Sequence, residues 1–268
     1  MTSPSWSPEQ YLKFAEPRAR PFDDLVARIM TADPVAVVDL GCGPGNVTRT
    51  LLDRWPHAQV IGVDSDAAMI TAAQQIATEA PDGRLHFTLG DIESWVPDGV
   101  VDVIVANAVL HWVPDHVDLL PRWLAALRPG GSLAFQIPRP ADDRGATALR
   151  TVTSAPRLSG RFDGVATPGA LASGPTCVRG AEAYADILGC LDCSVDAWET
   201  TYIHLLPGDD PVLGWFAGSG LRPYTDRLDD DDSAAFRFDL AAALREAYPR
   251  RSYGTLLPFR RVFVVAQR

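Results

Sequence analysis

The sequence predicts an α/β fold with a parallel, doubly wound sheet, on three observations. Short apolar runs alternate with helical patterns through the first half of the chain, which is typical of repeated βαβ units. One of these runs ends with Asp39-Leu40 and is followed at once by a loop with glycine at every second position, Gly41, Gly43 and Gly45. The chain of 268 residues is also long enough to bury a sizeable core without disulfides.

The expected strands are short runs of Val, Ile, Leu and Ala that stop at polar residues, glycine or proline. They fall in the first half of the chain at Ala36–Leu40, Gln59–Asp64, Leu85–Leu89, Val101–Asn107 and Ser132–Ile137. Helical patterns lie between them at Asn46–Trp55, Asp66–Ala80 and Asp118–Leu127. The turn at Arg128–Gly131 leads into the fifth strand. Ahead of the sheet, Pro8 to Met30 predicts one or two helices, with a break or a helix start at Pro21.

The pattern changes after Pro138. Residues 139–176 are rich in Gly, Pro, Ala, Ser and Asp and show little periodicity, which predicts a long loop or a lid. A helix is then expected at Arg179–Leu188, and strands are expected at Cys193–Leu206 and Arg261–Gln267. The segment between these strands, from 210 to 248, is expected to be helical, and its run of acids at 229–232 is typical of a solvated helix start.

Composition excludes some classes of function. The chain has 24 Lys and Arg against 34 Asp and Glu, a net charge of −10, which argues against nucleic acid as a substrate. No stretch approaches the length of apolar sequence that crosses a membrane, and the N-terminus lacks the features of a signal peptide, so a cytoplasmic protein is expected. Cys190 and Cys193 have the spacing of a redox or zinc motif, but no second pair completes a metal site, so we expect them to pack inward. A monomer is compatible with these features.

The glycine-rich turn is shared by folds that bind dinucleotides and folds that bind S-adenosylmethionine (SAM). The dinucleotide pattern requires a third glycine three residues after the second, and this chain lacks it. Asp39, just before the loop, would repel a pyrophosphate but would attract the sulfonium and the α-amino group of SAM. The turn therefore favours SAM.

Polar groups also follow the next strands. Asp64 ends the second strand and is expected to accept both ribose hydroxyl groups, although it could instead cap the following helix. Asp91 follows the third strand and Asn107 ends the fourth. Because ligands bind outside the carboxyl ends of parallel strands, these residues predict one site. The cofactor-binding candidates are Asp39, Gly41, Cys42, Gly43, Gly45, Asp64, Ser65, Met69, Asp91, Ile92, Asn107 and Tyr11.

The order of these motifs identifies a family. The chain carries, in succession, VVDLGCGPG, IGVDSDAAMI, GDIESW, ANAVLHWVPD and LRPGGSLAFQIP. These segments resemble the motifs of the class I SAM-dependent methyltransferases. The resemblance implies a Rossmann-like, seven-stranded, mostly parallel sheet in the order 3-2-1-4-5-7-6, with SAM as cofactor and no metal. The pattern along the chain predicts one domain over 1–268, and we expect a helical cap at 1–30, a SAM-binding core at 31–138, a lid or loop at 139–180 and a helical substrate cap at 207–256.

Further segments resemble the members of this family that esterify trans-aconitate, a small tricarboxylate. They are WSPEQYLKFAEPRARP near the N-terminus, and TTYIHLLP, WFAGSGLRPY and FRRVFVVA late in the chain. This resemblance implies a monomethyl ester as product. A carboxylate is already ionised at neutral pH, so no general base is required, and we expect a structural or polar-contact role for His111. Another small acid or acyl intermediate as acceptor, a non-catalytic SAM-binding module and a nicotinamide oxidoreductase remain alternatives.

A tricarboxylate bound to an acidic protein needs local cations. Arginine suits carboxylates because its planar fork makes two parallel hydrogen bonds. We expect Arg222 and Arg260 to contribute most, followed by Arg20 and Arg18. The aromatic and amide candidates for the same role are Trp112, Tyr224, Gln136 and Tyr202.

Overall fold

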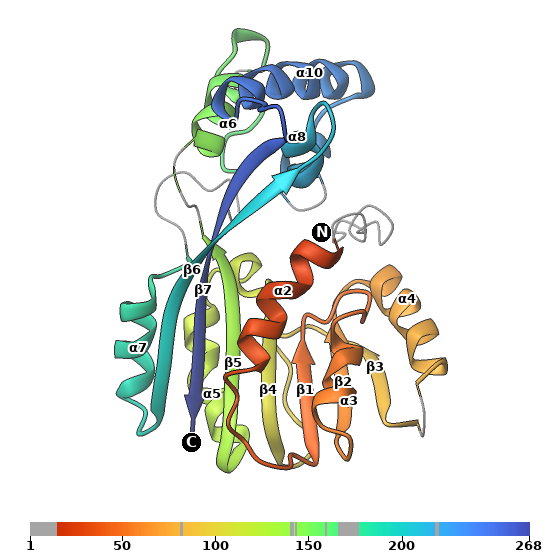
Figure 1. The fold of residues 1–268 in the computed structure, drawn as a ribbon, viewed down its shortest axis with the longest axis vertical. Helices are drawn as coiled ribbons and strands as arrows, with labels where there is room; N and C mark the ends of the chain where they lie inside the picture. Colours follow the sequence, from red (N-terminus) through yellow and green to blue (C-terminus); the bar gives the residue numbers. More distant parts are fainter. Residues whose placement is uncertain are drawn as a thin grey trace. The chain divides into compact units, whose positions relative to one another are not determined.

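A computed structural model describes residues 15–80, 83–139, 142, 144–158, 160–165, 177–217 and 220–268. Its strands form one seven-stranded sheet in the order β3-β2-β1-β4-β5-β7-β6 (Figure 1), which confirms the predicted order. The strands are β1 Ala36–Leu40, β2 Gln59–Asp64, β3 Leu85–Leu89, β4 Val101–Asn107, β5 Leu127–Arg139, β6 Ser194–Leu206 and β7 Thr255–Gln267. The pairs β1–β2, β1–β4, β2–β3 and β4–β5 are parallel.

The first four strands have the predicted bounds, but β5 begins earlier than the expected Ser132. The predicted turn at 128–131 lies inside β5 as an irregularity, where the register with β4 shifts between Val101 and Val103. Gly130 has φ +81°, and its N–H donates to the carbonyl of Arg268 at 2.7 Å. The C-terminal end of the chain therefore pairs with these residues and extends the strand.

The chain divides into two compact units, which are described separately. Unit 1 comprises Met1–Ile137, Cys177–Glu199 and Val262–Arg268, and unit 2 comprises Pro138–Thr176 and Thr200–Arg261. The long strands β6 and β7 contribute residues to both units.

The helices of unit 1 are α2 Ala15–Val26, η1 Thr48–Thr50, α3 Leu51–Arg54, α4 Ala67–Thr78, η3 Leu110–Trp112, α5 His116–Ala126 and α7 Ala181–Gly189. The predicted helix at 46–55 is thus shorter, because Asn46 and Val47 still belong to the turn out of the glycine-rich loop. Pro21 lies inside α2 and does not break it. Its ring removes one N–H donor, which the rest of the helix tolerates. The core of this unit includes the fully buried Leu40, Ile104 and Phe135.

Unit 2 contains α6 Arg144–Thr153, η4 Pro156–Leu158, α8 Pro211–Ala217, α9 Arg222–Thr225 and α10 Asp230–Ala247. The helix α6 corrects the expectation of irregular structure throughout 139–176, and residues 166–176 lie outside the described part. Its buried side, which includes Ala146, Leu149 and Val152, has helical spacing. The expected start of α10 is confirmed, because Asp229 accepts a hydrogen bond from the Asp232 N–H at 2.8 Å.

The cysteines differ in environment. Cys42 is buried in the glycine-rich loop. Cys193 is half-buried, and its thiol donates to the carbonyl of Leu188 at 3.1 Å. Cys190 is exposed, so the expectation that it packs inward was wrong: the chain leaves α7 at this residue and turns through Asp192, which has φ +56°. Within the described ranges, no helix is long and apolar enough to cross a membrane.

Candidate functional site

The glycine-rich loop follows β1, and its three glycines all have positive φ: +76° at Gly41, +56° at Gly43 and +80° at Gly45. Two of them are also required by packing. A Cβ on Gly41 would lie 2.5 Å from Cγ2 of Val109, and one on Gly45 would lie 2.5 Å from Cζ of Phe87. A Cβ on Gly43 would meet no atom within 4 Å. The middle of the loop therefore presents bare backbone that a ligand can approach closely.

Asp39 lies beneath this loop in β1 and is only 1% exposed. Its Oδ2 accepts a hydrogen bond from the Thr48 hydroxyl at 2.6 Å, whereas Oδ1 is buried without a hydrogen-bond partner among the described residues. Burial raises the pKa of this carboxyl to about 7, against the lowering effect of Thr48, and the nearby Asp64 charge raises it further. A buried carboxylate oxygen of this kind favours a cationic ligand or an N–H donor.

Asp64 ends β2 and is half-buried. Its Oδ2 accepts from the Gly43 N–H at 2.8 Å, and its Oδ1 accepts from the Asp66 N–H at 2.9 Å. Burial raises its pKa, and these hydrogen bonds oppose the rise. The cap of α4 is Asp66, which accepts from the backbone N–H groups of residues 68 and 69. Asp64 is therefore not the helix cap, and it holds the glycine-rich loop against the end of β2.

The remaining cofactor candidates include residues at the carboxyl ends of the neighbouring strands. Asp91 is exposed after β3, and its Oδ1 accepts from the Glu93 N–H at 2.9 Å. Asn107 is half-buried at the end of β4, while Ser65 is exposed. The side chains of Cys42, Met69 and Ile92 are 3%, 4% and 6% exposed. Tyr11 lies outside the described residues. All the described members of this set belong to unit 1.

The acceptor candidates of unit 1 lie in three places. Arg20 is exposed on α2, and Arg18 belongs to the same helix, but its side chain lies outside the described part. Trp112 is half-buried in η3, with its ring centroid 5.3 Å from that of His111. Gln136 is fully buried in β5, and its side chain donates a hydrogen bond to Asn107.

The acceptor candidates of unit 2 separate into two environments. Arg222 is partly exposed at the start of α9, with its Nε 3.9 Å from Asp226. Tyr224 is buried, and its ring lies 5.2 Å from that of Phe162 in an edge-to-face contact. Arg260 is half-buried in β7, and Tyr202 is buried in β6.

The neighbour of Arg260 is the more buried cation. Arg261 is 4% exposed, and its guanidinium lies 4.8 Å from the centroid of the Phe259 ring. The Phe259 ring in turn meets the Trp215 ring edge-to-face at 5.4 Å, and Trp215 lies 4.6 Å from His204. Alternate side chains of a strand face the same way, so the sequence places Arg261 on the same face as Phe259, but it does not show which face of the strand is buried.

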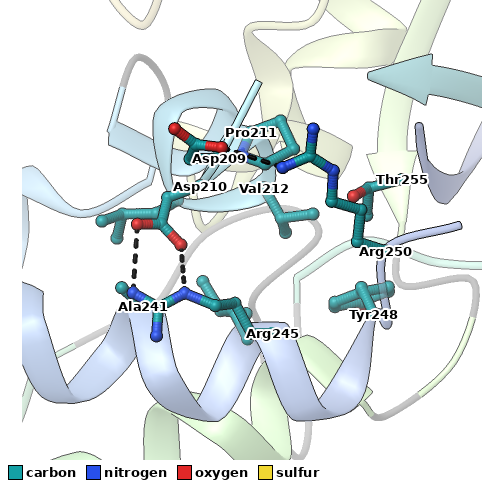
Figure 2. Close-up of a pocket in the computed structure, with 11 residues that line it drawn as sticks. Asp209, Asp210, Pro211, Val212, Ala241, Arg245, Tyr248, Arg250 and Thr255 are labelled. Atoms are coloured by element: carbon teal, nitrogen blue, oxygen red, sulfur yellow. Dashed lines mark hydrogen bonds and ion pairs between the residues drawn. The ribbon is translucent and has the colours of Figure 1, made fainter. Parts of the chain in front are cut away.

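One pocket of unit 2 contains none of the predicted site residues. Figure 2 shows it between α8, the end of α10 and the start of β7, with a volume of about 320 Å³. Its two arginines are paired: Arg245 makes two hydrogen bonds to Asp210 at 2.6 and 3.2 Å, and Arg250 donates to Asp209 at 2.8 Å. The aspartates thus compensate the positive charge that an anionic ligand would need.

Comparison with known proteins shows both a domain match and whole-chain relatives. Residues 37–131 match the family model described as a methyltransferase domain. A trans-aconitate 2-methyltransferase of Streptomyces avermitilis is 45% identical over 275 residues, which cover 99% of this chain and 97% of the relative. The protein of the same name in Streptomyces coelicolor is 47% identical, covering 100% and 88%. That of Mycobacterium tuberculosis is 42% identical, covering 98% and 96%.

Solved structures with the same fold are more distant. Haemonchus contortus phosphoethanolamine N-methyltransferase 2, in complex with SAM, superposes with a TM-score of 0.57 at 13% identity, covering 93% of this chain and 52% of that one. The YcgJ protein of Bacillus subtilis superposes with a TM-score of 0.55 at 16% identity, covering 93% and 98%. At these identities the likeness shows the fold alone.

Proposed function

The chain belongs to the trans-aconitate 2-methyltransferase family, whose members are SAM-dependent methyltransferases, and from this premise we propose that it forms a monomethyl ester on one carboxylate of trans-aconitate. The identity to these relatives, 42–47% over nearly the whole chain, is the observation that carries the choice of acceptor. The net charge of −10 supports a small-molecule acceptor rather than nucleic acid.

The residues at the carboxyl ends of β1 and β2 fit SAM. Asp39 has a buried oxygen without a hydrogen-bond partner among the described residues, which suits the α-amino group or the sulfonium of SAM. The open backbone at Gly43 suits close approach of the methionine part. Asp64 is half-buried beside this loop and can accept from the ribose hydroxyl groups. We propose these three residues as the principal cofactor contacts, with Asp91 toward the adenine amino group.

SAM, when bound, supplies a methyl group that is electrophilic because it is attached to a positively charged sulfur. In the proposed reaction, a carboxylate oxygen of the acceptor would form the O–CH₃ bond, the S–CH₃ bond would break, and its electron pair would stay on sulfur. No proton is removed. The protein therefore contributes by orienting the two reactants and by excluding water from the nucleophile.

We propose arginines as the groups that hold the carboxylates of the acceptor. As in the sequence-based prediction, Arg222 and Arg260 are proposed to contribute most to binding the acceptor, followed by Arg20 and Arg18. Arg261 joins them, because its burial beside an aromatic ring strengthens its interaction with an anion. Trp112, Tyr202 and Tyr224 remain proposed as walls of the acceptor site.

The test is incubation of the full chain with SAM and, separately, trans-aconitate, cis-aconitate and citrate, with mass spectrometry of the products. A monomethyl ester formed fastest from trans-aconitate is the expected result. Turnover with another acid but not with trans-aconitate rejects trans-aconitate as the acceptor. If the protein binds SAM but methylates none of the three acids, the enzyme assignment is rejected for these substrates. That result is the one expected of a non-catalytic SAM-binding module.

Arginine variants test the acceptor contacts. Arg222→Ala, Arg260→Ala and Arg261→Lys should each raise KM for trans-aconitate by about tenfold or more, since each removes a charge-assisted or bidentate hydrogen bond. Arg250→Ala is the matched control, because this arginine is exposed and pairs with Asp209. An unchanged KM in all three variants rejects the proposed contacts.

A further inference from the structure

Gln136 connects the ends of two neighbouring strands within unit 1. It lies in β5, the strand next to β4 in the sheet (Figure 1), and its register partner is Asn107, the last residue of β4. Its side chain is fully buried. The Nε2 group of Gln136 donates a hydrogen bond to Oδ1 of Asn107. The backbone carbonyl of Gln136 accepts from the N–H of Ala108 at 2.9 Å. One buried residue thus holds both the Asn107 side chain and the backbone that follows it.

The backbone that Gln136 holds is in an unfavourable conformation. Ala108 has φ +53°, in the left-handed region that costs free energy for a residue with a Cβ. The next residue, Val109, occupies the space that a side chain at Gly41 would need, 2.5 Å from an added Cβ. Gln136 therefore supports a turn that packs directly against the glycine-rich loop.

The hydrogen bond from Gln136 also determines which end of the Asn107 amide, Oδ1 or Nδ2, faces Gln136. Because Oδ1 accepts from Gln136, the Nδ2 group of Asn107 is left as a donor. An amide donor at the carboxyl end of a strand suits a ligand carboxylate. Both reactants of the proposed reaction carry one: SAM in its methionine part, and the acceptor on each of its acidic groups.

We propose that Gln136 is a positioning residue, which orients the amide of Asn107 so that Nδ2 donates to a ligand carboxylate. The inference rests on the proposed function for the identity of that carboxylate. It gives Gln136 an indirect role, in place of the direct substrate contact expected from the sequence. The contact with the ligand belongs to Asn107.

Three variants distinguish the effect of the orientation of the Asn107 amide from the effect of the volume of the Gln136 side chain. Gln136→Glu has nearly the same shape, but it replaces the donor by a carboxylate that accepts from Nδ2 of Asn107, so the amide is turned round. Gln136→Met removes the hydrogen bond and keeps the volume. Asn107→Asp still accepts from Gln136, but it presents an oxygen where the ligand donor should be. Gln267→Met is the control, because this glutamine donates to the Gly130 carbonyl at 3.2 Å from the end of β7.

The probes are S-adenosylhomocysteine, methylthioadenosine, which lacks the amino-acid part, and trans-aconitate. If the carboxylate is that of the cofactor, Gln136→Glu and Asn107→Asp should weaken S-adenosylhomocysteine binding by about tenfold in calorimetry and leave methylthioadenosine binding unchanged. If it is that of the acceptor, both nucleoside affinities should hold while KM for trans-aconitate rises by a similar factor. Either result supports the proposal, provided that Gln267→Met behaves as wild type.

The proposal is overturned if the folded Gln136→Glu variant binds both nucleosides and trans-aconitate as wild type does. It is also overturned if the affinities for S-adenosylhomocysteine and methylthioadenosine fall by the same factor, because that result indicates a general structural role for Gln136. If neither Gln136 variant folds, Asn107→Asp decides on the same two criteria. A wild-type protein that makes no ester from trans-aconitate rejects the proposed function, but the contrast between S-adenosylhomocysteine and methylthioadenosine still tests the role of Gln136.

Discussion

The buried carboxyl of Asp39 should make the stability of the ligand-free protein fall as pH rises. Its pKa is about 7 in the folded chain and 3.8 as an ordinary carboxyl. Between these two values the folded state binds a proton that the unfolded state has lost. The free energy of unfolding therefore contains a contribution that is fully present below the ordinary pKa and is lost as pH rises through the folded pKa.

The size of this effect follows from the pKa in the folded state. Each pKa unit corresponds to about 1.4 kcal/mol, and about 1.5 units separate pH 5.5 from the folded value. Asp39 should therefore cost the protein about 2 kcal/mol of stability between about pH 5.5 and about pH 8.5. Asp39→Asn has nearly the same shape, can still accept from Thr48, and cannot titrate, so its stability should lack this loss.

The assay is urea denaturation of the ligand-free wild type and of Asp39→Asn at a series of pH values. Other groups that titrate in both proteins largely cancel in the difference between the two curves. Asp53→Asn is the control, since Asp53 is exposed on α3, and it should follow the wild-type curve. Parallel curves for the wild type and Asp39→Asn would refute the argument, because they would show that Asp39 does not titrate in this range.

Three further predictions concern the glycine-rich loop, a buried hydrogen bond and a buried histidine. Gly45→Ala should destabilise the protein by more than about 2 kcal/mol in urea denaturation. The new Cβ would clash with the Phe87 ring, and the alanine would have to adopt the positive φ of the glycine. Gly43→Ala, with open space around it, should cost only about 1 kcal/mol, and equal losses would contradict this reasoning. Tyr184→Phe should cost about 1–2 kcal/mol, since its hydroxyl bonds Nε2 of His116 at 2.7 Å in the core, whereas the exposed Tyr253→Phe should cost little. Burial lowers the pKa of His116. The contribution of His116 to the free energy of unfolding should therefore be full above pH 6.5 and be lost as pH falls below that value. A His116→Gln variant whose stability depends on acidic pH as that of the wild type does would contradict this.

The strands were predictable from the sequence where local signals and burial agree. β1 to β4 have the expected bounds, because each is an apolar run that stops at a polar residue or glycine. The helix α6 was not predicted, since its buried side is made of Gly145, Ala146, Ala148, Leu149 and Val152. Small residues of this kind have the composition of a loop, and only their spacing shows the helix. The start of β5 was misplaced because its first residues depend on pairing with Arg268, far away in the sequence.

For the candidate site, the sequence predicted which strand ends carry polar groups but not how those groups bond to one another. Parallel order brings the ends of β1 and β2 together, so Asp39 and Asp64 could be assigned to one site. The partner of Asn107 could not be assigned, because Gln136 stands in a continuous apolar run and its burial depends on the register of β5. Similarly, the choice between Arg260 and Arg261 depends on which face of β7 is buried.

Two local costs are concentrated at the carboxyl ends of the neighbouring strands β1 and β4 in unit 1. Asp39 keeps a carboxyl oxygen buried without a hydrogen bond among the described residues, and Ala108 adopts a left-handed conformation in the turn after β4. Both costs would be unnecessary for folding alone, since an apolar residue at 39 and a glycine at 108 would avoid them. Their presence where the glycine-rich loop meets the turn after β4 is the expected signature of a site whose polar groups are completed by a ligand. The same reasoning predicts that SAM, by supplying a cationic partner to Asp39, should bind more tightly as this carboxyl ionises above about pH 7. Asp39→Asn should remove that pH dependence in calorimetry, and an equal pH dependence in both proteins would contradict the assignment of Asp39 to the cofactor.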